Sequence, residues 1–114
     1  MKVKSINIAY QSYENKMELE SIDQELISRA EEVLKNAYAV YSQFQVGAAL
    51  LLDSGEIITG NNQENIAYPS SLCAERVALY YCKAHAPNAI VKKIAIMAKS
   101  KKGELLEVIS PCGA

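Results

Sequence analysis

The sequence contains no tryptophan, one phenylalanine and one histidine, and its hydrophobic runs are short. The longest run, residues 46–52, has seven residues, whereas a helix that crosses a membrane needs about 20 apolar residues. No apolar block follows the N-terminal residues 1–4, so we expect no secretory signal. These absences argue against a membrane partner.

An excess of charge of one sign is also lacking, because 12 Lys and Arg residues face 13 Asp and Glu residues for a net charge of −1. A protein that binds a nucleic-acid backbone usually carries a basic excess that neutralises phosphates, so we expect no nucleic-acid partner. Only three cysteines are present. An odd number of cysteines without a signal indicates a reducing compartment, which we take to be the cytoplasm. There cysteines serve as metal ligands or catalytic groups more often than in disulfides.

The chain that remains has the composition of an ordinary soluble domain, with 114 residues, half of them hydrophobic. We divide it into a polar N-terminal arm, residues 1–20, and one domain, residues 21–114. Apolar residues spaced three and four apart predict an amphipathic helix over residues 22–38, begun by a capping box of Ser21 and Gln24.

The rest of the pattern predicts two strands, a helix, a third strand and a last short strand or loop, at residues 45–52, 57–60, 73–84, 90–98 and 104–109. The first of these strands is apolar throughout, which predicts burial on both faces. The order of elements predicts an α/β domain with a mixed β-sheet and helices packed on it.

Two short motifs carry the chemistry of the sequence. Cys73-Ala74-Glu75-Arg76 opens the second predicted helix, and Pro111-Cys112-Gly113-Ala114 stands at the other end of the domain. Together they resemble the zinc-dependent nucleoside deaminases, whose signature combines H/C-x-E with P-C-x-x-C. Three further segments resemble the small homo-oligomeric cytidine deaminases in the same order, at residues 41–49, 60–65 and 66–68.

The resemblance implies a three-layer fold, a mixed sheet with helices on both faces, and a zinc ion held by Cys73 and Cys112. Zinc suits hydrolytic deamination because it lowers the pKa of bound water from 15.7 to about 7. A catalytic zinc site needs three protein ligands, and the motif places the third, another cysteine, just beyond Ala114. The predicted helix N-terminus at Cys73 would favour a thiolate through its dipole and free N–H groups.

The resemblance also assigns roles to the neighbouring residues. Glu75 would be the catalytic proton shuttle, which protonates ring N3 and then the leaving amine. Arg76 would donate to the thiolates and offset their negative charge. Substrate contacts would come from five further residues. Phe44 would pack its ring against the base, Ala74 would contact the pyrimidine through its backbone, and Asn62 and Glu64 would bind the sugar hydroxyls. Tyr68 would lie near the site or at a subunit interface.

Several of these residues also have an ordinary structural interpretation. Phe44 could be plain core, Asn62 a turn residue and Glu64 a solvated charge. Cys82 has no ligand-like neighbour, so we expect it to pack in the core. His85, close to Pro87, is expected at the surface or at a helix end.

The resemblance therefore implies hydrolytic deamination of free cytidine and 2′-deoxycytidine to uridine, 2′-deoxyuridine and ammonia, in pyrimidine salvage, by a homotetramer or homodimer in the cytoplasm. One alternative is a sibling deaminase of a cytosine-bearing antibiotic such as blasticidin S. Another is a catalytically dead binding or assembly module of the same fold, which the missing third ligand would support. A polynucleotide editor is disfavoured by the net charge and by the lack of a basic groove with aromatics.

Overall fold

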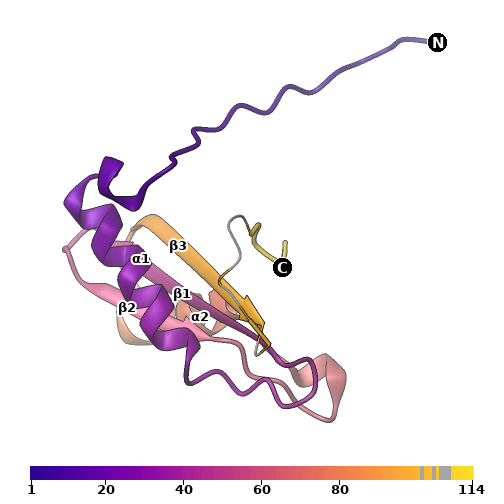
Figure 1. Ribbon diagram of the computed structural model, residues 1–114, viewed down its shortest axis with the longest axis vertical. Coiled ribbons are helices and arrows are strands. Elements are labelled where there is room, and N and C mark those ends of the chain that lie inside the picture. Colours follow the sequence, from indigo (N-terminus) through magenta and orange to yellow (C-terminus); the bar gives the residue numbers. More distant parts are fainter. Residues whose placement is uncertain (101, 104, 106–108) are drawn as a thin grey trace.

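The computed structural model describes residues 1–100, 102–103, 105 and 109–114. Residues 1–14 form no helix or strand and extend away from the folded domain, exposed along their length (Figure 1). The elements that follow are η1 (Lys16–Glu18), α1 (Ser21–Leu34), β1 (Phe44–Leu52), β2 (Ile57–Asn61), η2 (Tyr68–Ser70), α2 (Ala74–His85) and β3 (Val91–Ser100).

The sheet has three described strands in the order β2-β1-β3, and both pairings are antiparallel. The expected hairpin of the first two strands is confirmed, with Leu50 of β1 opposite Ile58 of β2. On its other side Leu50 pairs with Ile94 of β3. The parallel pairing of a mixed sheet is not among these described strands.

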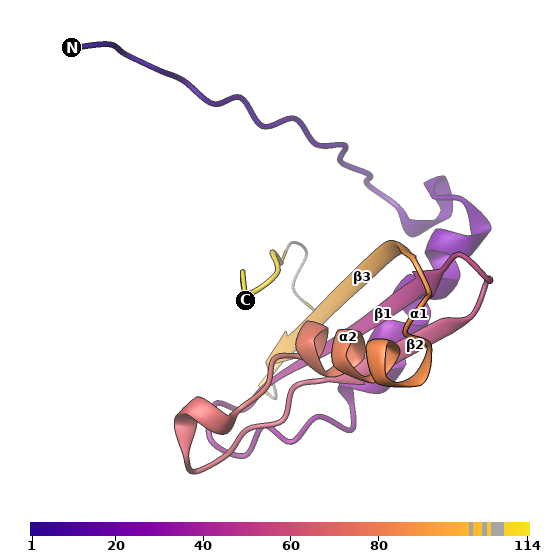
Figure 2. The ribbon, with the colours of Figure 1, turned by 180° about the vertical axis from the view of Figure 1, so that it is seen from behind.

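Helices cover both faces of the sheet, as expected (Figure 1 and Figure 2). The cause is visible in the alternation of β1, whose side chains point to opposite faces in turn. Leu50 and Leu52 are buried in one cluster with Ala78 and Cys82 of α2, whereas Ala49 is buried in another with residues of α1. The central strand is apolar because a helix excludes water on each side, which confirms the three-layer α/β fold.

Glycines bring the helices into direct contact with the sheet. A Cβ atom on Gly47 of β1 would meet the backbone of α1, at Ala30 O and at Leu34 N. A Cβ atom on Gly60 of β2 would lie 2.6 Å from Ala78 N and 2.8 Å from Ala74 O. The first turns of α2 therefore pack directly on the backbone of β2.

Replacing Gly60 with alanine is expected to destabilise the fold by about 1–3 kcal/mol, because overpacking against a backbone cannot be relieved by a side-chain rotation. Urea denaturation followed by circular dichroism measures the loss. Gly103→Ala is the matched control, because no atom lies within 4 Å of the added Cβ and its φ is not in the left-handed region. Equal stability of the two variants would contradict this account of the contact.

The end of the first helix differs from the prediction. α1 stops at Leu34 rather than Tyr38, because the Tyr38 N–H donates outside the helix, to Asn62 O at 3.0 Å. The predicted capping box is also wrong. The N-cap is Glu20, which makes no side-chain capping bond, and Gln24 Nε2 instead donates to Leu19 O at 2.9 Å.

Other boundaries agree with the prediction within a residue or two. The predicted segment 104–109 falls mostly outside the described residues. In the described part of the chain, no helix has the length and apolar character needed to cross a bilayer.

Candidate metal centre

Three predicted site residues converge at the start of α2. Cys73 is the N-cap of this helix, and Glu75 lies in its first turn. Cys112 comes from the C-terminal segment, 39 positions from Cys73, and its Sγ lies 3.0 Å from Cys73 Sγ. Its backbone N–H donates to Glu75 Oε1 at 3.2 Å. The potential ligand atoms of all three residues lie within 4.8 Å of one another, so the structure brings together the two ends of the signature.

The three residues differ in their access to solvent. Glu75 is 8% exposed and is the only buried polar or charged side chain found among the described residues. Cys73 is half-buried, whereas Cys112 is exposed. A carboxylate in the first turn of a helix is stabilised by the helix dipole, and here it is also held by the Cys112 N–H. The carboxylate of Glu75 is thus the buried part of the cluster, and the thiol of Cys112 is the part that solvent reaches.

The helix N-terminus favours a thiolate at Cys73 through the backbone N–H of Arg76, but burial and the neighbouring groups oppose it. Burial raises the pKa of the Cys73 thiol to about 11, and the hydrogen bond from Cys112 and the nearby Glu75 charge act in the same direction. The backbone N–H of Arg76 lowers the pKa but is outweighed. Metal ligands must be deprotonated, so a cation that binds here displaces a proton from Cys73.

The donor set fits zinc. Two thiolates on one tetrahedral zinc ion lie about 3.8 Å apart, because each Zn–S bond is about 2.3 Å. Cys73 and Cys112 lie 3.0 Å apart, so a small movement of the exposed Cys112 would open the pair to that spacing. Thiolates bind zinc in preference to calcium or magnesium. The third cysteine expected beyond Ala114 stays a prediction.

Asn62 and Glu64 lie beside the start of β1, where their side chains bond to the backbone. Asn62 Oδ1 accepts from Val46 N at 2.9 Å, and Asn62 Nδ2 donates to Phe44 O at 2.9 Å. Glu64 Oε1 accepts from the N–H groups of Tyr41 and Ser42 at 3.0 and 3.2 Å. Their roles toward a sugar, and that of half-buried Phe44 toward a base, stay predictions. The backbone bonds were not predicted from the sequence.

The remaining candidates are separated by burial. Tyr68 is 85% exposed on η2, and Ala74 is fully buried at the start of α2. Cys82 packs in the core, as expected, with an exposure of 1%. His85 is at the surface, also as expected, where its ring stacks on Tyr81 and its Nε2 lies 3.5 Å from Glu56.

Comparison with known proteins decides the family. A profile of the family described as "Cytidine and deoxycytidylate deaminase zinc-binding region" matches residues 20–114. This chain belongs to that family.

Similar proteins within this deaminase family include the cytidine deaminase of Halalkalibacterium halodurans, 42% identical over 91 residues, which cover 80% of this chain and 64% of that protein. The cytidine deaminase of Sporosarcina psychrophila is 37% identical over 91 residues, which cover 80% of this chain and 62% of that protein. The crystal structure of cytidine deaminase from Burkholderia pseudomallei has a TM-score of 0.65 and 36% identity, and the match covers 78% of this chain and 67% of that one. The chain spans less than two thirds of the length of these two curated relatives.

Arg76 has a hydrogen-bond donor without a partner next to the cluster of Cys73, Glu75 and Cys112. Its Nε is buried and is the one buried side-chain nitrogen or oxygen without a hydrogen-bond partner among the described residues. The guanidinium carbon lies 5.9 Å from the centre of the Tyr80 ring. The described hydrogen bonds include none from the guanidinium to Cys73 or Cys112. An unpaired buried donor one residue from Glu75 fits the predicted role, because zinc-bound thiolates would offer it an acceptor.

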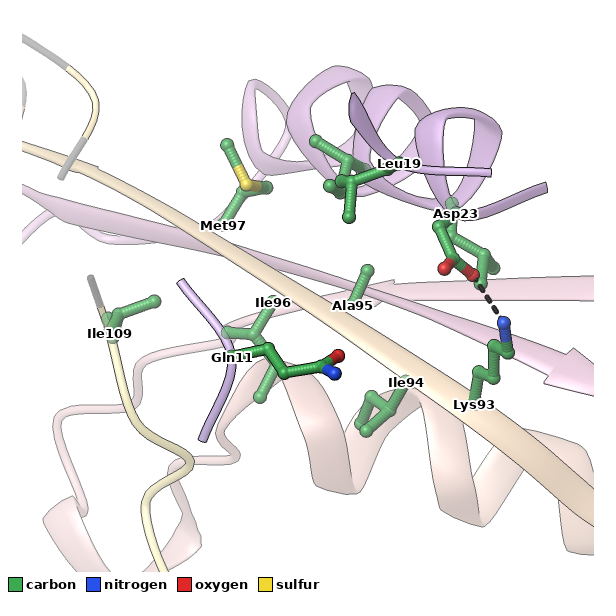
Figure 3. A pocket seen from close by; sticks show the side chains of 11 residues that line it. Gln11, Leu19, Asp23, Lys93, Ile94, Ala95, Ile96, Met97 and Ile109 are labelled. Carbon is green, nitrogen blue, oxygen red and sulfur yellow. Dashed lines mark hydrogen bonds and ion pairs between the residues drawn. The ribbon is translucent and has the colours of Figure 1, made fainter. Parts of the chain in front are cut away.

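The cluster of Cys73, Glu75 and Cys112 is separate from a cavity of about 720 Å³ between α1 and β3, lined in part by Leu26, Ile94 and Met97 (Figure 3). Lys93 Nζ donates to Asp23 Oδ1 at 2.7 Å at this cavity, and that hydrogen bond raises the pKa of Lys93. None of the predicted site residues lines the cavity. Its size therefore does not identify the place of the chemistry, which the Cys73, Glu75 and Cys112 donors mark.

Proposed function

We propose that this chain is the zinc-binding part of an enzyme that hydrolyses cytidine and 2′-deoxycytidine to uridine and 2′-deoxyuridine with release of ammonia. The observation that carries the proposal is the convergence of Cys73, Glu75 and Cys112 on one point of a chain that belongs to the deaminase family. The matched relatives named above are cytidine deaminases, and this supports the choice of a cytosine nucleoside as substrate.

Zinc held by Cys73 and Cys112 would lower the pKa of the attacking water. Glu75 handles the protons. Its carboxylate accepts a proton from the water and transfers it to N3 of the ring as the water oxygen bonds to C4. It then accepts the proton of the new C4 hydroxyl and delivers it to the amine, which leaves as ammonia while the C4 carbonyl forms. The Cys112 N–H on Oε1 orients this carboxylate, and burial keeps bulk water away from it. Arg76 balances the charge of the two thiolates.

The proposed substrate site consists of five residues: Phe44, Asn62, Glu64, Tyr68 and Ala74. Phe44 would pack against the base, Ala74 would contact it through the backbone, and Asn62 and Glu64 would bind the sugar hydroxyls. Tyr68 is exposed, so it can reach either substrate or a neighbouring subunit. We further propose a homo-oligomer, a tetramer or a dimer, that works in the cytoplasm in pyrimidine salvage.

The fall in ultraviolet absorbance of cytidine tests the proposal directly. The protein is purified with zinc and given cytidine, 2′-deoxycytidine and blasticidin S in parallel. Turnover of the two nucleosides supports the proposed function, whereas turnover of blasticidin S alone would replace it with the antibiotic deaminase. Absence of turnover together with absence of bound zinc would favour a binding or assembly module.

A further inference from the structure

The segment of residues 62–64 makes hydrogen bonds to the start of β1 on both sides of Phe44. On the N-terminal side, the Glu64 carboxylate accepts the N–H groups of Tyr41 and Ser42 on a single oxygen. On the C-terminal side, Asn62 bonds to Phe44 O and to Val46 N. Phe44 therefore lies between two anchors, and each anchor is a side chain assigned so far only to the substrate.

The backbone of the same segment repeats the pattern. Tyr38 N donates to Asn62 O at 3.0 Å, Glu64 N donates to Tyr38 O at 2.8 Å, and Asn62 N donates to Val46 O at 3.2 Å. The main chain thus fixes both ends of residues 38–46. The two side chains add hydrogen bonds within this range, at Tyr41, Ser42, Phe44 and Val46.

A strained residue sits between the two anchors. Gln43 has a φ of 59°, in the left-handed region that is disfavoured for a residue with a Cβ. Such a conformation persists only where the surroundings fix it. Gln43 N donates to Ala39 O at 3.0 Å and Gln43 Nε2 to Val40 O at 2.9 Å, and these local bonds are completed by the anchors on Ser42 and Phe44.

We propose that Asn62 and Glu64 are positioning residues, which hold the left-handed turn at Gln43 and so set where Phe44 stands. The inference rests on the proposed function for one step only, the contact of Phe44 with the base. A carboxylate gives Glu64 a strong grip, because hydrogen bonds to a charged acceptor are about twice as strong as neutral ones. Substrate binding would then depend on these two residues through the loop as well as through the sugar.

Amide hydrogen exchange measured by NMR on the whole chain tests the anchors without any need for turnover. Glu64→Ala is expected to speed exchange at Tyr41 and Ser42 by about tenfold or more, because a charge-assisted bond is lost at each amide. Glu64→Gln is expected to keep most of the protection, since its amide oxygen can accept the same bonds. Asn62→Ala is expected to speed exchange at Val46.

Gln63→Ala is the matched control. It lies between the two anchors, its side chain bonds only to Asn61 Oδ1 in the described structure, and it is expected to leave all three amides unchanged. Unchanged exchange at Tyr41 and Ser42 in Glu64→Ala would overturn the proposal for Glu64. If Asn62→Ala does not fold, Asn62→Leu replaces it, because leucine has a similar size and can neither accept from Val46 nor donate to Phe44. Unchanged exchange at Val46 in the folded variant would overturn the proposal for Asn62.

Kinetics separate positioning from direct contact. A positioning role predicts that KM for cytidine rises in Glu64→Ala and returns toward its original value in Glu64→Gln, with kcat less affected. A KM equally raised in both variants, with the amides still protected in Glu64→Gln, would show that the hydrogen bonds to the loop add nothing to substrate binding and would overturn the positioning role. Protected amides in a protein that turns over no nucleoside would refute the proposed function and leave the anchors in place.

Discussion

Replacing Glu75 with glutamine is expected to slow cytidine deamination by about two to four orders of magnitude, the range for loss of a positioned acid–base group. Glutamine has nearly the same shape, and its Oε1 can still accept the Cys112 N–H that lies 3.2 Å from this atom. The geometry of the cluster should therefore survive. An amide, however, neither takes a proton from water nor delivers one to N3 or to the amine.

The measurement is the initial rate of the absorbance change, made at equal zinc content for both proteins. Glu25→Gln is the matched control, because Glu25 is an exposed glutamate on the solvent side of α1, and its rate is expected to stay within a factor of two of the unchanged protein, roughly the effect of a surface substitution. A Glu75→Gln rate equal to that of the control would show that the buried carboxylate is not the proton shuttle.

The layers of the fold follow from features that are local in the sequence. The apolar spacing of α1, with Leu26 and Ala30 buried, and the uninterrupted apolar run of β1 are patterns of period 3.6 and of two-sided burial. The turn before β2 is marked by Gly55, whose φ is +89°. Such signals need no knowledge of partners, and the element order and an α/β domain with helices packed on a sheet could therefore be predicted, whereas the three layers were implied by the resemblance.

The end of α1 depends on a residue far away in the chain, and its prediction was wrong. The apolar pattern continues past Leu34, but the Tyr38 N–H bonds to Asn62 and leaves the helix. The helix N-terminus at Cys73 suggested a thiolate, and the local N–H does lower the pKa of this thiol, but burial raises it by more. Both outcomes are set by tertiary packing, which periodicity and motif spacing do not describe.

The candidate site shows the same division. Cys73 and Glu75 are two positions apart in one helical turn, so their proximity could be predicted. Cys112 could be joined to them only through the resemblance, since 39 positions separate it from Cys73. The anchors made by Asn62 and Glu64 on residues 41–46 had no sequence signal, because any acceptor of suitable length can bond to a backbone N–H.

Cys112→Ser is expected to weaken zinc binding by more than about 100-fold, because even partners outside the ligand shell contribute about 10- to 100-fold to metal affinity. The structure offers two thiols within 3.0 Å of each other and a carboxylate beside them, so one substitution removes half of the sulfur ligands described. The bound zinc is measured by atomic emission on protein dialysed against a fixed free-zinc buffer. This readout does not depend on turnover.

Cys82→Ala is the matched control for cysteine removal. Cys82 lies on the same helix as the cluster but is buried in the core at 1% exposure, so its loss should lower stability slightly and leave the zinc content unchanged. Equal zinc content in Cys112→Ser and Cys82→Ala would show that zinc does not bind at this cluster, and would contradict the water-activating role proposed for the start of α2.

Zinc affinity is expected to rise with pH in the unchanged protein. The Cys73 thiol, with its pKa of about 11, must release a proton when it binds the metal, and this release is easier at high pH.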